Sequence, residues 1–238
     1  MDSSLRSDPD LAFVIPARNE ARFIASAISS VIDQTVTLER LELIVVENGS
    51  IDDTGEAAQR ALALARGLRG TVITQAMASI PGAKNRGAKA ASAPLLVFLD
   101  ADSRAAPELA QRVLDWAKRG YQAGSIKIVA DSTDRLDRAF FGLIEWGKGL
   151  FGIRANMMYC DRDLFLRSGG FGEHIRLAED LEFLVRLKRQ GVRVGHVKDS
   201  YIATSPRRLH ELPLRLGIVT TFARWALAHI GIGRRWRY

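Results

Sequence analysis

The first half of the chain repeats one pattern four times: a short apolar run precedes a longer segment whose apolar residues have helical spacing. The apolar runs cover 11–15, 41–46, 71–74 and 95–99, and the periodic segments cover 19–34, 53–67, 81–92 and 107–119. Strands that alternate with helices in this way pair into a parallel sheet with helices on both faces. The pattern therefore predicts an α/β fold with a mixed, mainly parallel central sheet, and ligands bind such sheets beyond the carboxyl ends of the strands.

The second half is less regular but shows no sign of a separate domain. Strands are predicted at 125–129, 156–159 and 192–197, and helices at 136–151, 161–167 and 179–190. The sequence contains no repeat, no low-complexity tract and no long linker, and its 238 residues are enough for one substantial core. We therefore expect residues 1–238 to form a single domain.

Charge is unevenly distributed along the chain. A net charge of +7 would favour a nucleic-acid or membrane-surface partner if it were spread over the molecule. Residues 186–238 hold 12 Lys and Arg against 2 Asp and Glu, whereas residues 1–185 hold 22 against 25. An acidic body with a basic C-terminal segment argues against a nucleic-acid binder.

The N-terminal residues, the lengths of the apolar stretches and the cysteine content indicate where in the cell the protein is expected. The first ten residues are polar, and no apolar stretch reaches the 18–20 residues of a spanning helix. We expect neither a signal peptide nor a membrane span, and hence a cytoplasmic protein. Cys160 is the single cysteine, so an internal disulfide is excluded.

Three acidic segments lie where the fold would place a ligand. The first runs from Glu47 to Thr54 and is equally well explained as a strand-to-helix turn capped by Ser50 or Asp52. The third, Glu179-Asp180, opens a predicted helix. Acids there complement the helix dipole, or one of them acts as a general base toward a hydroxyl.

The second acidic segment, Asp100-Ala101-Asp102, follows a very apolar strand. Its two carboxylates repel each other, and a divalent cation such as Mg²⁺ or Mn²⁺ commonly bridges such groups to substrate phosphates. Asp-x-Asp is also common in surface turns, but its position at the end of a buried strand favours a cation site. No Ser–His or Cys–His arrangement stands out in the sequence as a rival catalytic centre.

Five motifs share a fixed order: Val14-Ile-Pro-Ala-Arg-Asn-Glu20, Val45-Val-Glu-Asn-Gly-Ser-Ile-Asp-Asp-Thr54, Gly82-Ala-Lys-Asn-Arg-Gly87, Phe98-Leu-Asp-Ala-Asp102, and Gly169-Gly-Phe171 with Ala178-Glu-Asp-Leu-Glu182. Together they resemble family 2 glycosyltransferases with the GT-A fold, from about residue 11 to 205. The resemblance implies inverting transfer of a sugar from a nucleoside-diphosphate sugar to an acceptor hydroxyl. It divides the domain into a nucleotide-binding half (about 11–103), an acceptor half (about 104–205) and a basic C-terminal segment (about 206–238).

The resemblance also assigns roles by position. Asp102, with Asp100, would hold Mn²⁺ or Mg²⁺, and Asp180 would be the general base. Residues of the strand-end loops and the C-terminal segment would contact the donor: Pro16, Ala17, Arg18, Glu20, Glu47, Asn48, Asp52, Lys84, Asp100, Ala101, Arg207 and Arg208. Glu47, Asn48 and Lys84 replace the more usual Asp, Asp and Arg, which leaves the nucleotide base open.

The acceptor side is less well defined. Glu179, Gly170 and Trp146 are candidates for the acceptor or sugar pocket, although aromatic residues at helical spacing, such as Trp146 and Tyr159, more often belong to a core. Residues 209–232 predict a helix, and Arg234-Arg-Trp-Arg-Tyr238 follows it. This segment fits a peripheral membrane contact, a core helix or a dimerising helix equally well, and a membrane contact would suit a lipid-linked acceptor.

Two other functions remain open. A nucleotidyltransferase would share the sugar nucleotide and a similar sheet, but it needs a Gly-rich loop after the first strand, and Pro16 to Glu20 contain no glycine. A catalytically inactive glycosyltransferase homologue is disfavoured because Asp100, Asp102 and Asp180 are all present.

Overall fold

A computed structural model describes residues 8–76, 79–151, 157–175 and 178–210, without the side chains of residues 148–151 and 208. The strands are β1 (Leu11–Ala17), β2 (Leu41–Asn48), β3 (Arg69–Gln75), β4 (Leu95–Phe98), β5 (Ser103–Ala105), β6 (Ala123–Ala130), β7 (Met157–Asp161) and β8 (Val194–Thr204). The helices are α1 (Ile24–Ile32), η1 (Leu38–Arg40), α2 (Thr54–Ala63), α3 (Ile80–Ala90), α4 (Leu109–Lys118), α5 (Arg135–Phe151), α6 (Arg162–Arg167), α7 (Glu179–Arg189) and α8 (Arg207–His210).

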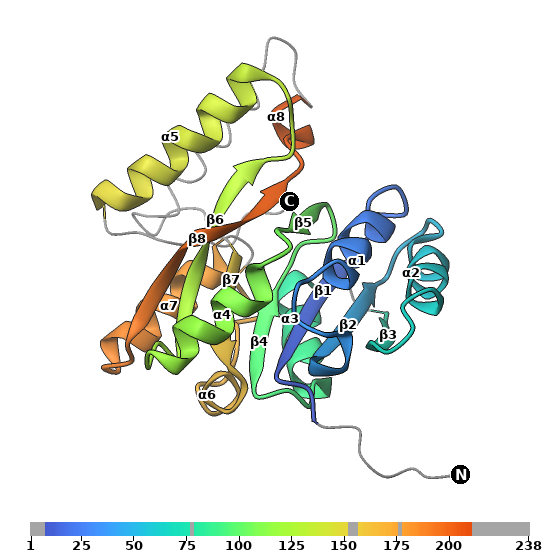
Figure 1. The fold of residues 1–238 in the computed structure, drawn as a ribbon, viewed down its shortest axis with the longest axis horizontal. Coiled ribbons are helices and arrows are strands. Elements are labelled where there is room, and N and C mark those ends of the chain that lie inside the picture. The colour runs from blue at the N-terminus through green and yellow to red at the C-terminus, as the bar shows by residue number, and fades with distance from the viewer. Residues whose placement is uncertain (1–7, 77–78, 152–156, 176–177, 211–238) are drawn as a thin grey trace.

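The described strands form one sheet in the order β3-β2-β1-β4-β7-β6-β8-β5, with helices on both faces (Figure 1). The pairs β1–β2, β2–β3, β1–β4 and β6–β8 are parallel. The pairs β4–β7, β6–β7 and β5–β8 are antiparallel. The predicted mixed, mainly parallel α/β sheet is therefore confirmed.

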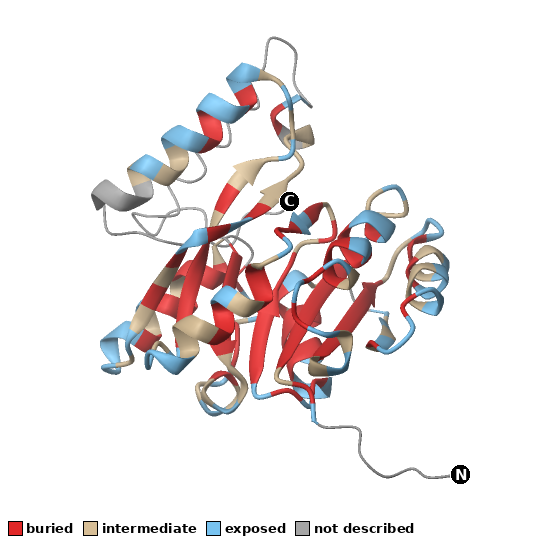
Figure 2. Cartoon of the chain, in the orientation of Figure 1, coloured by how far each residue is buried: buried red, intermediate tan, exposed pale blue. Residues whose placement is uncertain are grey.

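Strand β1 lies between two cores and is buried along its whole length. Phe13 and Ile15 face the core that includes α1, and Val14 faces the core that includes residues of α3. This two-sided burial explains the continuous apolar runs of the sequence, and Figure 2 shows it as red along the central strands. Helix α3 approaches β1 closely at Gly87, where a Cβ would lie 2.3 Å from Val14 Cγ1.

The strand order reverses between β1 and β4. The chain moves outward from β1 to β2 and β3, and then returns to pair β4 with the other side of β1. In an open α/β sheet the loops that leave such a pair of strands diverge, and a ligand crevice opens between them. The topology therefore places the crevice between the loop after β1 and the segment Asp100–Asp102 after β4.

Two features of the second half differ from the sequence prediction. Strand β8 runs to Thr204 instead of 197, because it resumes pairing with β6 after an irregularity at Ile126/Ile128 and also pairs with β5. Strand β5 was not predicted, since three residues are too short for a periodic signal. Together they carry the chain back over the carboxyl edge of the sheet, beside Asp102.

Helix α5 forms where it was predicted and lies beyond the carboxyl edge of the sheet, on the side of β6 and β8 (Figure 1). Phe140 and Phe141 are buried, whereas Leu136, Leu143 and Trp146 are exposed. The predicted helix at 209–232 lies largely outside the described residues, which end with α8 at His210. No helix in the described ranges is long and apolar enough to cross a membrane.

Candidate active site

The loops after β1 and β2 are joined by hydrogen bonds at the carboxyl edge of the sheet. The Asn19 side chain accepts a bond from the Ile51 N–H (2.9 Å), and the Asn19 N–H donates to Ser50 Oγ (3.1 Å). The Glu20 N–H donates to Thr54 Oγ1 (2.8 Å). Asn19 has a left-handed backbone (φ 55°), a conformation that Asn tolerates well. These contacts fix the loop that carries Glu20.

Asp52 joins the same two loops just before α2. Its carboxylate accepts hydrogen bonds from the Thr54 N–H (3.1 Å), from the Thr54 hydroxyl and from the Ala21 N–H (3.3 Å). Desolvation acts to raise the pKa of Asp52, but these hydrogen bonds hold it below its ordinary value. Asp53 is the N-cap residue of α2 and its side chain makes no capping hydrogen bond, so the predicted cap at Ser50 or Asp52 was wrong. Contact of Asp52 with a donor stays a prediction.

Glu47 and Asn48 end β2 as buried polar residues. The Glu47 carboxylate accepts a hydrogen bond from the Ser50 N–H. The Asn48 Oδ1 accepts bonds from Gln75 Nε2 (2.8 Å) and from the Ser79 N–H (3.1 Å), and so links β2 to β3 and to the start of α3. Both side chains therefore connect neighbouring segments of the half that was predicted to bind the nucleotide, and their contacts with a donor stay predictions.

Three residues far apart in the sequence meet in the crevice between β1 and β4. Arg207 Nη2 lies 3.1 Å from Asp102 Oδ2 and forms a second, close ion pair with Glu20 Oε1. The guanidinium carbon lies 4.7 Å from the centre of the Phe23 ring. The Asp102 side chain is only 7% exposed. The structure thus brings the predicted site residues Asp102 and Arg207 into contact, and their roles stay predictions.

A second charged group lies around Lys84 on α3. Lys84 Nζ is 2.6 Å from Glu179 Oε1, and both side chains are buried. Burial alone would lower the pKa of Lys84, but attraction by Glu179, Asp100 and Asp180 raises it above its ordinary value. These carboxylates therefore lie close enough to Lys84 to act on its charge, which brings the first turn of α7 to the end of β4.

The loop before α7 is fixed by Asn85, the neighbour of Lys84. Asn85 accepts a hydrogen bond from the Phe171 N–H (2.8 Å) and donates one to the Phe171 carbonyl (2.9 Å). Gly170 has a left-handed backbone (φ 64°), and a Cβ there would lie 2.6 Å from Asn85 Oδ1. Arg186 Nη2 donates to the Gly170 carbonyl (2.6 Å). Gly170 thus permits a close approach of the backbone to α3.

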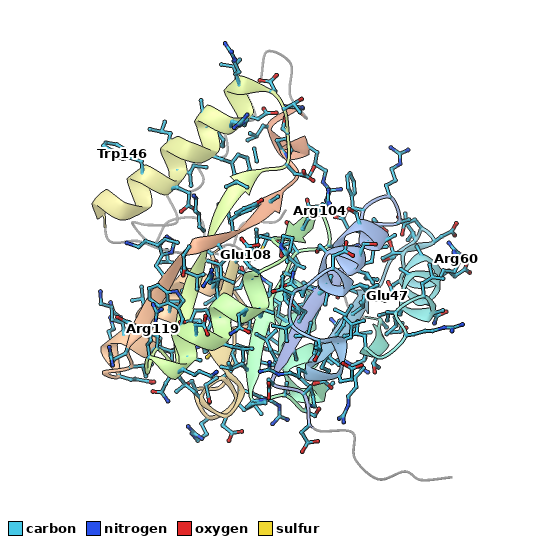
Figure 3. All side chains as sticks on the ribbon, in the orientation of Figure 1. Glu47, Arg60, Arg104, Glu108, Arg119 and Trp146 are labelled. Carbon is cyan, nitrogen blue, oxygen red and sulfur yellow. The ribbon has the colours of Figure 1, made fainter. Side chains whose placement is uncertain are left out.

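The remaining predicted residues differ in exposure. Pro16, Ala17 and Ala101 are buried and Arg18 is exposed, while the Arg208 side chain lies outside the described residues. Figure 3 shows Trp146 on the outer side of α5, well apart from Glu47 at the other end of the carboxyl edge. Trp146 is 65% exposed and therefore does not take the core position that is commoner for such aromatic residues, whereas Tyr159 is fully buried. A sugar-pocket role for Trp146 stays a prediction.

Sequence reasoning missed one polar cluster. His196 Nδ1 lies 2.9 Å from Ser125 Oγ, and His196 Nε2 lies 3.8 Å from Glu145 Oε2. Glu145 also accepts a hydrogen bond from the Ile128 N–H (3.2 Å). The Ser–His arrangement that the sequence did not reveal therefore exists, but Ser125 is only 2% exposed. The cluster fastens α5 to β6 and β8, and no signal in the sequence links these three positions.

The charge balance of the crevice suits a hard divalent cation. Among the described residues, the carboxylates outnumber the basic groups: Glu20, Asp100, Asp102, Glu179 and Asp180 face Lys84 and Arg207. No group of three or more His, Cys, Asp or Glu in the described ranges is arranged to hold a metal ion. Asp100 and Asp102 are carboxylates of the kind that Mg²⁺-type ions share with substrate phosphates, so the excess of negative charge fits a cation bound together with a phosphate ligand.

An α/β sheet with this strand order and with helices on both faces is the fold of the GT-A glycosyltransferases, as the match to two solved structures shows. The fold matches TarS from S. aureus, solved in complex with UDP, with a TM-score of 0.65 and 16% identity over 94% of this chain and 73% of that chain. It matches the mannosyltransferase PcManGT from Pyrobaculum calidifontis, solved with GDP-Man and Mn²⁺, with a TM-score of 0.68 and 20% identity over 92% and 65% of the two chains.

The family follows from the sequence match. Residues 12–172 match the model of glycosyl transferase family 2, and the chain belongs to that family. It is 28% identical to the uncharacterized glycosyltransferase EpsJ of Bacillus subtilis over 87% of this chain and 64% of that protein. It is 35% identical to validoxylamine A glucosyltransferase of Streptomyces hygroscopicus over 44% of this chain and 25% of that protein. The chain thus spans less than two thirds of these relatives.

Proposed function

We propose that this domain transfers a sugar from a nucleoside-diphosphate sugar to an acceptor hydroxyl, with Asp180 as general base and with inversion at the anomeric carbon. One observation carries the proposal: Asp100 after β4 and Glu179 and Asp180 at the start of α7 all act on the charge of Lys84, so the two acidic segments lie close together. Asp100 and Asp102 suit a cation and a diphosphate, and the start of α7 offers the buried carboxylate of Asp180.

The donor end of the reaction would use Asp102 and Asp100 to hold Mn²⁺ or Mg²⁺. The bound cation would neutralise charge that develops on the leaving diphosphate. Arg207 lies beside Asp102 and can offer its guanidinium to the same phosphate oxygens, because the planar group binds phosphate through two parallel hydrogen bonds. The nucleotide would lie against the Pro16–Glu20 and Glu47–Asp52 loops, whose mutual hydrogen bonds keep them in place.

The acceptor end would use Asp180. Its carboxylate would take the proton of the acceptor hydroxyl while the acceptor oxygen bonds to the anomeric carbon and the bond from that carbon to the diphosphate breaks. A single displacement of this kind inverts the anomeric centre. Lys84 lies in an ion pair with Glu179 and attracts Asp180, so we assign it the role of positioning these carboxylates at the start of α7.

The wider setting is also part of the proposal. The succinoglycan biosynthesis protein ExoU of Rhizobium meliloti is 26% identical over 77% of this chain and 58% of that protein. This relative supports a role in polysaccharide or glycolipid synthesis. A sugar or lipid-linked acceptor and a cytoplasmic location, with residues 209–238 peripheral on the membrane, would suit that role. The oligomeric state is left open.

The test is a panel of UDP-, GDP- and dTDP-sugars incubated with the protein and Mn²⁺. We expect release of nucleoside diphosphate from at least one donor, through slow transfer to water, and NMR of the freed sugar should show the inverted anomer first. Release with retained configuration would reject the single displacement. Absence of release from every donor, together with absence of nucleoside-diphosphate binding, would reject the proposed function.

A further inference from the structure

Arg207 occupies the position beside Asp102 where a cation would be expected. Its Nη2 lies 3.1 Å from Asp102 Oδ2 and also pairs closely with Glu20, which lies 187 positions away in the sequence. The side chains of Asp102 and Glu20 are 7% and 13% exposed, and Arg207 itself is 31% exposed. A guanidinium of the chain itself therefore already pairs with this carboxylate.

The backbone around Arg207 is anchored on both sides. The Ser205 N–H donates to the Asp102 carbonyl (3.1 Å), and Ser103 Oγ donates to Thr204 Oγ1 (3.1 Å). Beyond Arg207, His210 Nε2 lies 2.9 Å from Asp137 Oδ1 on α5. Because these contacts hold the main chain, the long side chain of Arg207 can change partners without moving β8 or α8.

Glu20 can keep Arg207 bound while the guanidinium exchanges its other partner. Its Oε1 holds Arg207, and its Oε2 is buried and accepts no hydrogen bond from a described residue. The Glu20 carboxylate thus depends on Arg207 for much of its stabilisation, since a buried charge that loses its partner is costly. Asp102 gains a new cationic partner when a divalent ion replaces Arg207, and Glu20 keeps Arg207 itself, so Arg207 can give up Asp102 without leaving either carboxylate uncompensated.

A guanidinium and a divalent ion cannot share the Asp102 carboxylate without strong mutual repulsion at this distance. We propose that Arg207 is a built-in, displaceable counter-ion of the donor site, which competes with the divalent cation for Asp102 and moves, about Glu20, onto the donor diphosphate. The proposal rests on the function proposed above. It makes the binding of cation and nucleoside diphosphate mutually dependent, because each is favoured once Arg207 has left Asp102.

The test measures Mn²⁺ binding without any nucleotide, from the electron paramagnetic resonance signal of free Mn²⁺. Wild type should bind Mn²⁺ weakly. Arg207→Met should bind it at least about tenfold more tightly, since Asp102 has lost its competitor. The matched control is Arg104→Met, which removes an equal charge from an exposed side chain two residues from Asp102 and should bind Mn²⁺ as wild type does.

Two further variants keep the test decisive. Arg207→Gln retains a hydrogen-bond donor for Glu20 and should show the same gain if the Met variant does not fold. Adding Asp102→Ala to either variant should abolish the gain. The proposal is overturned if neither Arg207 variant binds Mn²⁺ more tightly than wild type, or if the gain survives the loss of Asp102. Because no donor is present, this result is independent of whether the protein transfers sugar.

Discussion

Lys84→Met tests how the carboxylates around α7 are held in place. The Lys84–Glu179 pair is 2.6 Å long, and its side chains are 7% and 11% exposed. Removing the ammonium leaves Glu179 buried without this partner and exposed to repulsion from Asp100 and Asp180. Breaking a buried pair from one side typically costs about 3–5 kcal/mol, so we expect the free energy of unfolding to fall by about 3 kcal/mol.

The assay is urea denaturation followed by tryptophan fluorescence for Lys84→Met, Glu179→Gln and the double variant. The double variant should recover about 2 kcal/mol relative to the sum of the single changes, because the partner left behind is then neutral. Lys89→Met is the matched control, an exposed lysine on the same helix, and should change stability by less than about 0.5 kcal/mol. Additive single effects, or a cost no larger than that of the control, would refute the argument.

The pH dependence of this effect follows from the direction of the pKa shift. Burial acts to lower the pKa of Lys84, but the surrounding carboxylates raise it above the ordinary lysine value. A raised pKa in the folded state means that the stabilisation is complete below the unfolded pKa and is lost as the pH rises through the folded value. The stability difference between wild type and Lys84→Met should therefore stay constant from about pH 6 to 9, well below the ordinary lysine pKa.

Two further substitutions address the base and the loop before it. Asp180→Asn should lower the transfer rate by about 10²–10⁴-fold, while nucleoside-diphosphate binding measured by calorimetry stays near wild type. The control Asp163→Asn changes an exposed carboxylate and should alter neither quantity. Equal loss of binding and rate in Asp180→Asn would contradict the role of Asp180 as a base. Gly170→Ala should lower the melting temperature more than Gly169→Ala, because both glycines have left-handed backbones but only Gly170 would press a Cβ against Asn85. Equal losses would show that backbone strain alone matters there.

The fold of the first half could be predicted because its signals are local. The apolar runs of β1, β2 and β4 are buried on both faces, β3 lies at the edge of the sheet and is partly buried, and the helices carry apolar stripes. Helix boundaries shifted by a few residues: the segment predicted at 19–34 became α1 at Ile24–Ile32, since residues 18–23 form the loop that binds the turn before α2. Short β5 and the long second part of β8 exist through pairing with each other, which no local pattern encodes.

The acidic residues of the candidate site could be predicted from the sequence, but the ion pairs that they form with Arg207 could not. Asp100, Asp102 and Asp180 follow or open elements whose ends must meet, so their grouping follows from topology. The contact of Arg207 with Glu20 and Asp102 depends on where β8 ends, and that end was predicted seven residues too early. For the same reason, the sequence could name Arg207 as a phosphate-binding candidate without revealing that it already pairs with Asp102.

The most direct test of the account is calorimetric titration of UDP, GDP and dTDP into the protein with and without Mn²⁺, repeated on Asp102→Ala. The account predicts that at least one nucleoside diphosphate binds wild type more tightly with Mn²⁺ than without it, and that Asp102→Ala loses this difference. Binding that is equally strengthened by Mn²⁺ in Asp102→Ala would contradict the assignment of the donor site to the crevice between β1 and β4.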